Sequence, residues 1–190
     1  SAAKPGQTAH KLDDAIMYTV NASELLTGRP VVRVFNGGVE QVGFLDAPVQ
    51  ETDTIFTYAK AVVSGMDGTY TVTVDLADKA GNTAPGLAGT GWSVDASTPS
   101  VITGPTFNKD PASYKAGDVI AATFTTSENL DAPAPAMQLN VLPPVSMPCT
   151  ANGGNSYTCT LPAALTGTET PQGQTEVSIR LADPAGNTAS

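Results

Sequence analysis

One strand-and-turn sequence occurs twice in this chain, and it constrains the fold more than any other feature. Residues 76–84 read Leu-Ala-Asp-Lys-Ala-Gly-Asn-Thr-Ala, and residues 181–189 repeat that order with proline in place of lysine, 105 residues further on. Apolar and polar residues alternate just before each copy, as they do in a β-strand with one buried face. A repeat of this length that includes a strand and its turn predicts that the chain contains two copies of one domain.

The composition favours β-structure in both copies. The chain has 190 residues, of which 18 are glycine and 15 are proline, and an apolar period of 3.6 residues persists almost nowhere. Short alternating segments divided by turn residues are typical of all-β domains. The strands that we expect cover residues 15–22, 31–35, 39–45, 55–63, 70–77, 92–95, 100–103, 119–126, 137–142 and 176–181.

The repeat predicts two small domains, at residues 1–96 and 97–190, each long enough to bury its own core. Pro99 follows a short polar linker and cannot continue a strand ladder, because proline has no backbone N–H. The second half then retraces the first. Ser127-Glu128, for example, matches Ser23-Glu24 at a spacing of 104 residues.

The chain is out of phase with its own repeat. The second copy opens with an expected strand at 100–103, where the first copy has only the polar residues 1–12. The first copy closes with an expected strand at 92–95, whereas the second stops straight after its turn. We therefore expect the first domain to lack its first strand and the second to lack its last. Either the chain is a fragment of a longer array, or neighbouring repeats or identical subunits fill these edges by β-strand addition.

The two cysteines flank a hairpin signal. Cys149 and Cys159 lie on either side of Asn152-Gly153-Gly154-Asn155, a sequence that favours a tight turn between antiparallel strands. Cysteines at matched distances from such a turn face each other, so we predict a disulfide within a hairpin at 149–159. A disulfide indicates an oxidising, extracytoplasmic compartment.

The charge excludes one class of partner. The net charge of −9 comes from 18 acidic and 9 basic residues, and both halves are acidic, with 11 acids to 6 bases in residues 1–95 and 7 to 3 in residues 96–190. No basic stripe is present to bind nucleic acid. No run of about 18 apolar residues is present either, so we expect no membrane insertion.

Several motifs follow one another in an order that is typical of one family. They are Asp67-Gly68-Thr-Tyr70, Trp92-Ser-Val-Asp95 with Thr98-Pro99, Gly117-Asp118 with Phe124-Thr-Thr-Ser-Glu128, and both Asp-x-Ala-Gly-Asn turns. Together they resemble the bacterial immunoglobulin-like (Big-type) tandem repeats of secreted and surface adhesin-like proteins. The resemblance implies two tandem immunoglobulin-like antiparallel β-sandwiches. It also suits Tyr70 to a tyrosine corner, because this residue starts a strand after a turn.

The resemblance implies a non-enzymatic module that acts as a spacer, stalk or adhesive unit of a bacterial surface protein, outside the cell or on its surface. A host or surface glycan or protein is a candidate partner. Two alternatives stay open: a self-assembling extracellular fibre subunit joined head to tail by donated β-strands, and a ligand-binding accessory module of a secreted enzyme. Catalysis lacks support, because the only histidine is His10 and no nucleophile motif is present.

The acidic loops indicate one candidate cofactor, calcium. In an immunoglobulin-like sandwich the loop after the second strand and the turn before the last strand lie at the pole that the preceding linker enters. Carboxylate and amide oxygens are the ligands that calcium prefers. The alternative is that these Asp and Asn residues only hydrogen-bond their own turns. The candidate ligands are Asp95, Glu128, Asp183 and Asn187 at the second copy, and Glu24, Asp78 and Asn82 in the first.

Overall fold

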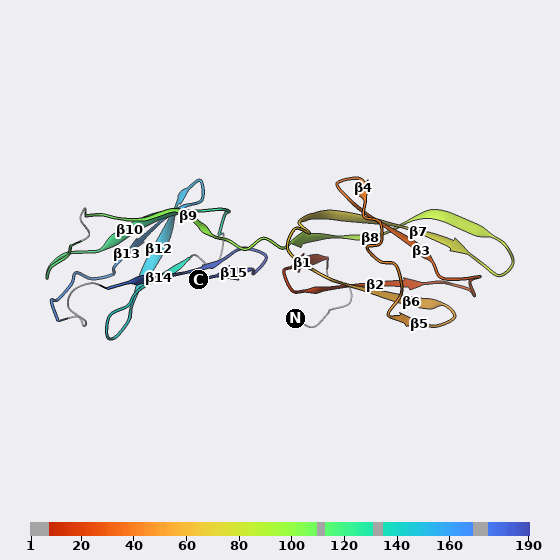
Figure 1. Ribbon diagram of the computed structural model, residues 1–190, viewed down its shortest axis with the longest axis horizontal. Coiled ribbons are helices and arrows are strands. Elements are labelled where there is room, and N and C mark those ends of the chain that lie inside the picture. Colours follow the sequence, from red (N-terminus) through yellow and green to blue (C-terminus); the bar gives the residue numbers. More distant parts are fainter. Residues whose placement is uncertain (1–7, 110–112, 131–134, 169–174) are drawn as a thin grey trace. The chain divides into compact units, whose positions relative to one another are not determined.

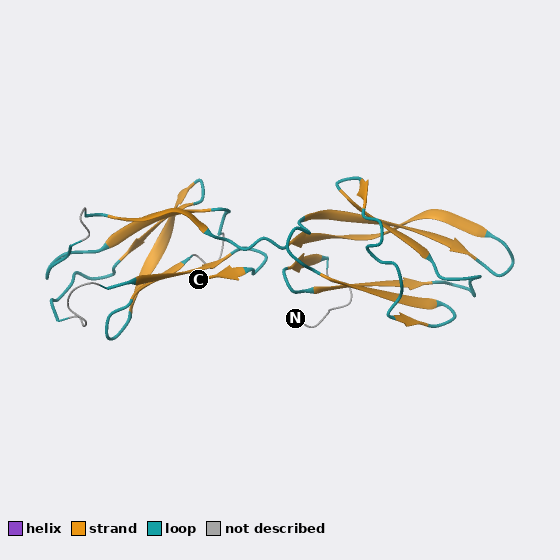
Figure 2. Cartoon of the chain, viewed as in Figure 1, coloured by secondary structure: helices purple, strands orange, loops and turns teal. Residues whose placement is uncertain are grey.

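The computed structural model describes residues 8–109, 113–130, 135–168 and 175–190, and every regular element in this part of the chain is a β-strand (Figure 2). These residues contain no helix that is long and apolar enough to cross a membrane. The chain divides into two compact units, Ser1–Ser97 and Thr98–Ser190. The all-β prediction is confirmed, and each unit folds around its own core.

The first unit is a sandwich of two sheets (Figure 1). One sheet has the order β1-β8-β7-β3-β4 and the other has the order β2-β6-β5. All of its strand pairs are antiparallel except β1–β8, which is parallel. The strands are β1 (Ala9–Lys11), β2 (Ala15–Asn21), β3 (Val31–Asn36), β4 (Val39–Glu40), β5 (Gln50–Glu51), β6 (Ile55–Ala61), β7 (Gly68–Ala77) and β8 (Thr83–Asp95).

Aromatic side chains fill the core of the first unit. The rings of Tyr70 and Trp92 stack with centroids 5.7 Å apart, and Tyr18 and Phe44 pack against Trp92 at 5.9 and 6.1 Å. The Tyr70 hydroxyl donates a hydrogen bond to the carbonyl of Met66 at 2.8 Å. This is the tyrosine corner that the sequence predicts, and it fixes the chain as it enters β7.

The second unit forms one continuous sheet of order β15-β14-β11-β12-β13-β10-β9 that folds over its own core. Strand β12 joins the two layers, because residues 145–148 pair with β11 whereas residues 149–153 pair with β13. Phe124 and Tyr157 stack in the core at 5.8 Å. The strands are β9 (Val101–Phe107), β10 (Ala121–Thr126), β11 (Ala136–Leu139), β12 (Val145–Gly153), β13 (Ser156–Thr160), β14 (Val177–Ala182) and β15 (Thr188–Ala189).

The largest differences between expected and observed strand lengths are at β8 and β4. We expected a last strand at 92–95, but β8 begins at Thr83, because glycines let this strand pass close to its neighbours. A Cβ at Gly91 would clash with the carbonyl of Tyr70, and one at Gly89 would clash with the Tyr18 hydroxyl. Conversely, β4 has two residues where we expected a strand at 39–45, since the chain there turns Leu45 into the core.

The prediction of missing strands is not confirmed. Residues Ala9–Lys11 form β1, so the first unit does have an N-terminal strand, although it pairs with β8 rather than with β2. In the second unit Thr188–Ala189 form β15, which pairs with the end of β14. Among the described residues, no strand pairs with the outer edge of β2.

The predicted disulfide hairpin is confirmed. Cys149 and Cys159 lie directly opposite each other on β12 and β13 and form a disulfide. The turn between them contains Gly154 at φ 59° and Asn155 at φ 61°. Two successive residues with positive φ match the right-handed twist of the flanking strands, which is why this sequence forms a tight hairpin.

Candidate functional site

The repeated turn is held by a clamp between its aspartate and its asparagine. In the second unit, Asp183 Oδ1 accepts hydrogen bonds from the backbone N–H of Gly186 at 2.7 Å and of Asn187 at 2.8 Å. The side-chain amide of Asn187 donates to Asp183 Oδ2, also at 2.8 Å. Asp183 and Asn187 are both 2% exposed. The clamp therefore takes three of the roughly four acceptor positions of the carboxylate.

The first unit builds the same clamp. Asp78 accepts hydrogen bonds from the Asn82 backbone N–H at 2.8 Å and from the Asn82 side-chain amide at 2.7 Å. Its own backbone N–H donates to the carbonyl of Asn82 at 3.0 Å. The side-chain amide of Asn82, followed by backbone N–H groups of the turn, holds the pKa of Asp78 below its ordinary value. The turn thus needs the ionised carboxylate.

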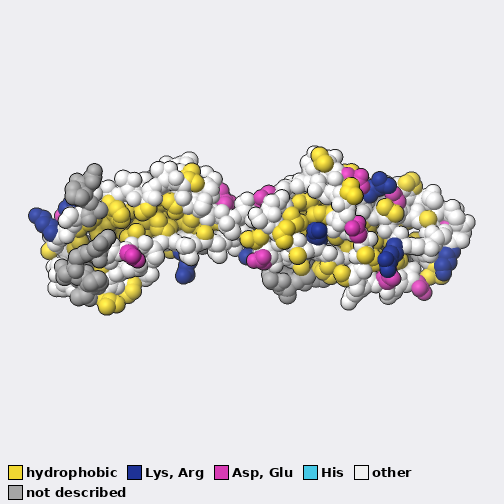
Figure 3. Space-filling model, in the orientation of Figure 1, with side chains coloured by type: hydrophobic (Ala, Val, Ile, Leu, Met, Phe, Trp, Pro, Cys, Tyr) yellow, Lys and Arg dark blue, Asp and Glu magenta, His cyan; other side chains and the backbone are white. Residues whose placement is uncertain are grey.

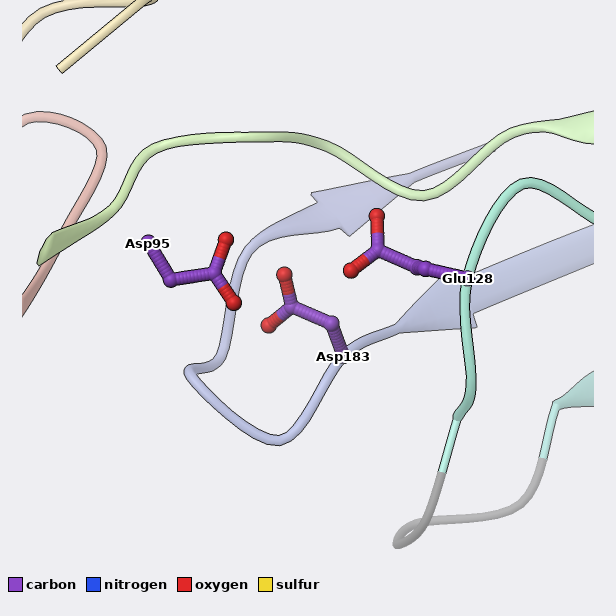
Figure 4. A group of neighbouring side chains, drawn as sticks. All are labelled: Asp95, Glu128 and Asp183. Atoms are coloured by element: carbon purple, nitrogen blue, oxygen red, sulfur yellow. The ribbon is translucent and has the colours of Figure 1, made fainter. Parts of the chain in front are cut away.

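In the second unit, Glu128 lies beside this clamp. Its carboxylate comes within 4.8 Å of the carboxylate of Asp183, and Figure 4 shows the two carboxylate groups next to each other. The buried Thr126 holds the Glu128 backbone, because its hydroxyl donates to the Glu128 carbonyl at 2.6 Å. Ser127 and Ser100 exchange two further hydrogen bonds beside it, at 2.9 and 3.0 Å. The backbone of this acidic loop is therefore fixed next to the turn.

Asp95 is the last residue of β8, where it lies opposite Lys11 in the β1–β8 pairing. It belongs to the first unit, whereas Glu128 and Asp183 belong to the second. Figure 4 also labels Asp95. That it shares a cation with the other two stays a prediction.

The first unit brings the equivalent loop and turn together, but not all of the predicted ligands. Leu26 forms an isolated antiparallel bridge with Asp78, and the backbone N–H of Lys79 donates to the carbonyl of Leu25 at 3.3 Å. The loop after β2 therefore lies beside the turn after β7, as expected. Glu24 itself is exposed. Within the described part of the chain, no group of three carboxylates or imidazoles forms at this turn.

The end of β8 depends on a residue whose role the sequence did not reveal. Asp67 accepts a hydrogen bond from the backbone N–H of Ala96 at 2.5 Å and another from the hydroxyl of Ser97 at 2.9 Å. The sequence presents Asp67-Gly68 only as part of a family motif ahead of the strand expected at 70–77. The distance of 29 residues between Asp67 and Ala96 gives no signal in the sequence, because the contact depends on β7 pairing with β8.

A shallow pocket of about 400 Å³ lies in the first unit, and the sequence did not predict it. At one side of it, Arg29 and Glu51 form a bidentate ion pair, with Nε to Oε2 at 2.6 Å and Nη2 to Oε1 at 3.0 Å. The hydrogen bond from Arg29 lowers the pKa of Glu51. Both side chains stay about half exposed, so the pair contributes little to stability. The pocket is lined by Leu25, Leu26, Gly28, Arg29, Glu51, Thr52, Asp53, Phe56 and Lys79.

The groups that often carry catalysis have structural positions. His10 lies in β1 and is 5% exposed, and both cysteines are in the disulfide. Basic side chains do not gather on the face shown in Figure 3, where they lie apart from one another. The described residues therefore present neither an exposed imidazole nor a free thiol.

No protein-family model matches the chain, and no curated protein matches it in sequence. Several solved structures of tandem modules are similar to this chain. Tandem immunoglobulin domains of titin are 15% identical over 95% of this chain and 87% of theirs, with a TM-score of 0.32. Fibronectin(III)-like modules of CbhA from Clostridium thermocellum are 13% identical over 97% and 85%, with a TM-score of 0.33. The amphioxus IgVJ-C2 molecule is 10% identical over 91% and 98%, with a TM-score of 0.35.

Proposed function

We propose that this chain is a non-enzymatic extracellular module that serves as a spacer or stalk in a bacterial surface protein. The observation that supports the proposal is the repeated architecture of the chain. Both β-sandwich units contain the same clamped turn, and the second unit also contains a disulfide. A disulfide between buried or half-buried cysteines suits an oxidising compartment. Repeated modules of this kind supply length and a scaffold, while their loops are open to variation.

Protease treatment of intact cells of the source organism tests this function. We expect protease to remove the module from intact cells. We also expect its cysteines to resist alkylation until a reductant is added. Cleavage only after lysis, with freely alkylated cysteines, would contradict the proposal. A cytoplasmic protein followed in the same samples controls for lysis.

We propose further that calcium binds beside the clamped turn of the second unit. The support is the pair Glu128 and Asp183, whose carboxylates approach within 4.8 Å and repel each other unless a cation or proton lies between them. Asp183 retains about one acceptor position beyond its clamp. Asp95 is separated from β9 by residues 96–100 only, so we include it as a third carboxylate. Asn187 would contribute its carbonyl oxygen, and Glu24, Asp78 and Asn82 would form a weaker equivalent.

Thermal unfolding with calcium and with a chelator tests the cation. A ligand at about 100 times its Kd stabilises the folded state by about 2.7 kcal/mol, so a clear rise in Tm with calcium is expected. Glu128→Gln should abolish that rise without breaking the clamp. Glu176→Gln is the matched control, because this residue is exposed and lies outside the cluster. An unchanged Tm in the unmodified protein would refute calcium binding.

The fibre subunit stays a second candidate, because the outer edge of β2 has no strand partner in the described residues. A donated strand from an identical subunit or a neighbouring repeat could bind there by β-strand addition. Host or surface glycans and proteins also stay proposed partners, and the pocket lined by Arg29 and Lys79 offers one surface for such contacts. An accessory role beside a secreted enzyme would use the same surface.

A further inference from the structure

One sheet edge of the first unit lacks the features by which proteins block unwanted strand pairing. Strand β2 has seven residues, contains no charged residue and no proline, and pairs with β6 without any register shift. Long, regular, uncharged edges are rare in monomers, because they offer unpaired N–H and C=O groups to another strand. The edge of β2 is therefore a candidate interaction surface.

The other sheet edges among the described residues are protected. Strands β1, β4, β5 and β15 have two or three residues each and cover only part of their neighbours. The uncovered part of β8 contains Pro85, and its pairing with β7 shifts register twice. The uncovered parts of β3, β6 and β14 each contain a basic residue, Arg33, Lys60 and Arg180. Strand β9 contains Gly104-Pro105, and its pairing with β10 shifts register twice. Short strands, proline and bulges are all devices that block edge pairing. Only β2 combines length, regularity and the absence of charge.

The backbone hydrogen bonds at both ends of the β2–β6 pair show which residues face the open edge. The N–H of Ala22 donates to Thr54, and the N–H of Val62 donates to Asp14, so the even-numbered positions of β2 bond to β6. Bonded and non-bonded pairs alternate along an antiparallel ladder. The residues whose N–H and C=O groups point away from β6 are therefore Ala15, Met17, Thr19 and Asn21.

We propose that β2 of one copy pairs antiparallel with β2 of a second copy, across a two-fold axis at Tyr18. In this register Met17 faces Thr19 of the other copy and Ala15 faces Asn21. Each of the four outward-facing residues then exchanges both of its backbone hydrogen bonds. A shift of two positions would leave at least one of them unpaired. The edge is thus self-complementary, as a two-fold interface requires.

The side chains and charges fit this register. Ile16 lies opposite Val20 on the core side of the sheet, and Tyr18 lies opposite itself, so apolar and aromatic groups meet across the new strand pair. Beyond the strand, the same register places Asp14 opposite Ala22 and Asp13 opposite Ser23. No acidic group faces another, although the chain carries a net charge of −9. The occupant that fits is therefore a second copy.

This pairing closes on itself, so it forms a dimer and not a head-to-tail fibre, and it is independent of calcium. A contact through one strand buries little surface, and we expect a weak dimer that forms with increasing concentration. Sedimentation velocity over a concentration series should show a monomer–dimer equilibrium. Met17→Lys/Thr19→Lys should abolish the dimer, because each lysine then faces a lysine of the other copy.

A charge-swapped variant at the same positions tests the register. Met17→Glu/Thr19→Lys places a glutamate opposite a lysine at both ends and should keep the dimer. Ala59→Lys is the matched control, because Ala59 is exposed and lies opposite Met17 on β6, away from the edge. This control should also stay dimeric. Loss of the dimer in the swapped variant, or its persistence in the double-lysine variant, would overturn the register.

Hydrogen exchange identifies other occupants. The amides of Met17 and Thr19 should become protected from exchange over the same concentration range in which the dimer forms. The amide of Tyr18, which bonds to β6, should be protected at every concentration. Protection of Met17 and Thr19 at monomer mass would mean that another segment of the same chain covers the edge. Assemblies that grow beyond two copies would mean open-ended strand donation. A monomer at every concentration with rapid exchange at both residues would mean that the edge stays bare. Each of these three outcomes would overturn the proposal.

Discussion

The side-chain amide of Asn187 donates a hydrogen bond to Asp183 at 2.8 Å, as Asn82 does to Asp78 at 2.7 Å in the other unit. These two pairs are the structural reason for the repeated sequence. Each fixes a turn that sets the position of the strand that follows. The aspartate is buried in both cases, so its carboxylate depends on its own turn for hydrogen bonds.

Removing the asparagine side chain should destabilise each unit. Asn187→Ala leaves one oxygen of a buried carboxylate without its donor, which costs about 1–3 kcal/mol. Urea unfolding of the full chain, followed separately through Trp92 in the first unit and circular dichroism for both, would measure the loss. Asn82→Ala should act on the first unit by a similar amount. Equal stability of Asn187→Ala and the unmodified protein would show that water replaces the clamp.

The stability of the first unit should fall in acid because of Asp78. Its folded pKa is lowered by hydrogen bonds from Asn82, so it binds a proton more weakly than an unfolded aspartate, whose pKa is about 3.9. Its contribution is therefore full above that value and is lost as the pH falls through the folded pKa. Stability measured between neutral and acidic pH should show a smaller dependence in Asp78→Asn. A parallel dependence in both proteins would contradict this role.

The disulfide should stabilise the second unit alone. Cys149 and Cys159 are separated by ten positions, and closing a loop of this size in the unfolded chain is worth about 2–3 kcal/mol. Cys149→Ala/Cys159→Ala should lose about that amount, and adding a reductant to the unmodified protein should approach the same value. The fluorescence transition of Trp92, which lies in the first unit, is the internal control and should not move.

Gly91 should not tolerate a side chain. A Cβ there would clash with the backbone carbonyl of Tyr70, so Gly91→Ala must push β8 away from β7. Overpacking of this kind costs about 1–3 kcal/mol. Gly28→Ala is the control, because its Cβ would meet nothing within 4 Å and its backbone is unstrained. Equal unfolding free energies of the two variants would show that β8 adjusts freely.

The amino-acid sequence by itself determined the features that depend on local chemistry. Alternation at 70–77 is enough to specify a strand, because every second side chain of a strand faces the core. The turn at Gly154-Asn155 and the facing cysteines follow from the same local geometry, as does the tyrosine corner at Tyr70, which acts over four residues. The duplication is visible in the sequence because both units use the same residues for the strand and the turn that follows it.

The tertiary structure alone decided the features that depend on pairing between distant segments. Residues Ala9–Lys11 have no strand pattern, and they become β1 only because β8 offers a parallel edge. Strand β8 runs through Gly89 and Gly91, where the sequence predicts no strand, and the missing side chains leave room for Tyr18 and Tyr70. Because β1 pairs with β8 and not with β2, the outer edge of β2 has no strand partner among the described residues. A sequence pattern indicates the conformation that one segment favours, whereas burial and hydrogen bonding in a sheet depend on which other strand pairs with it.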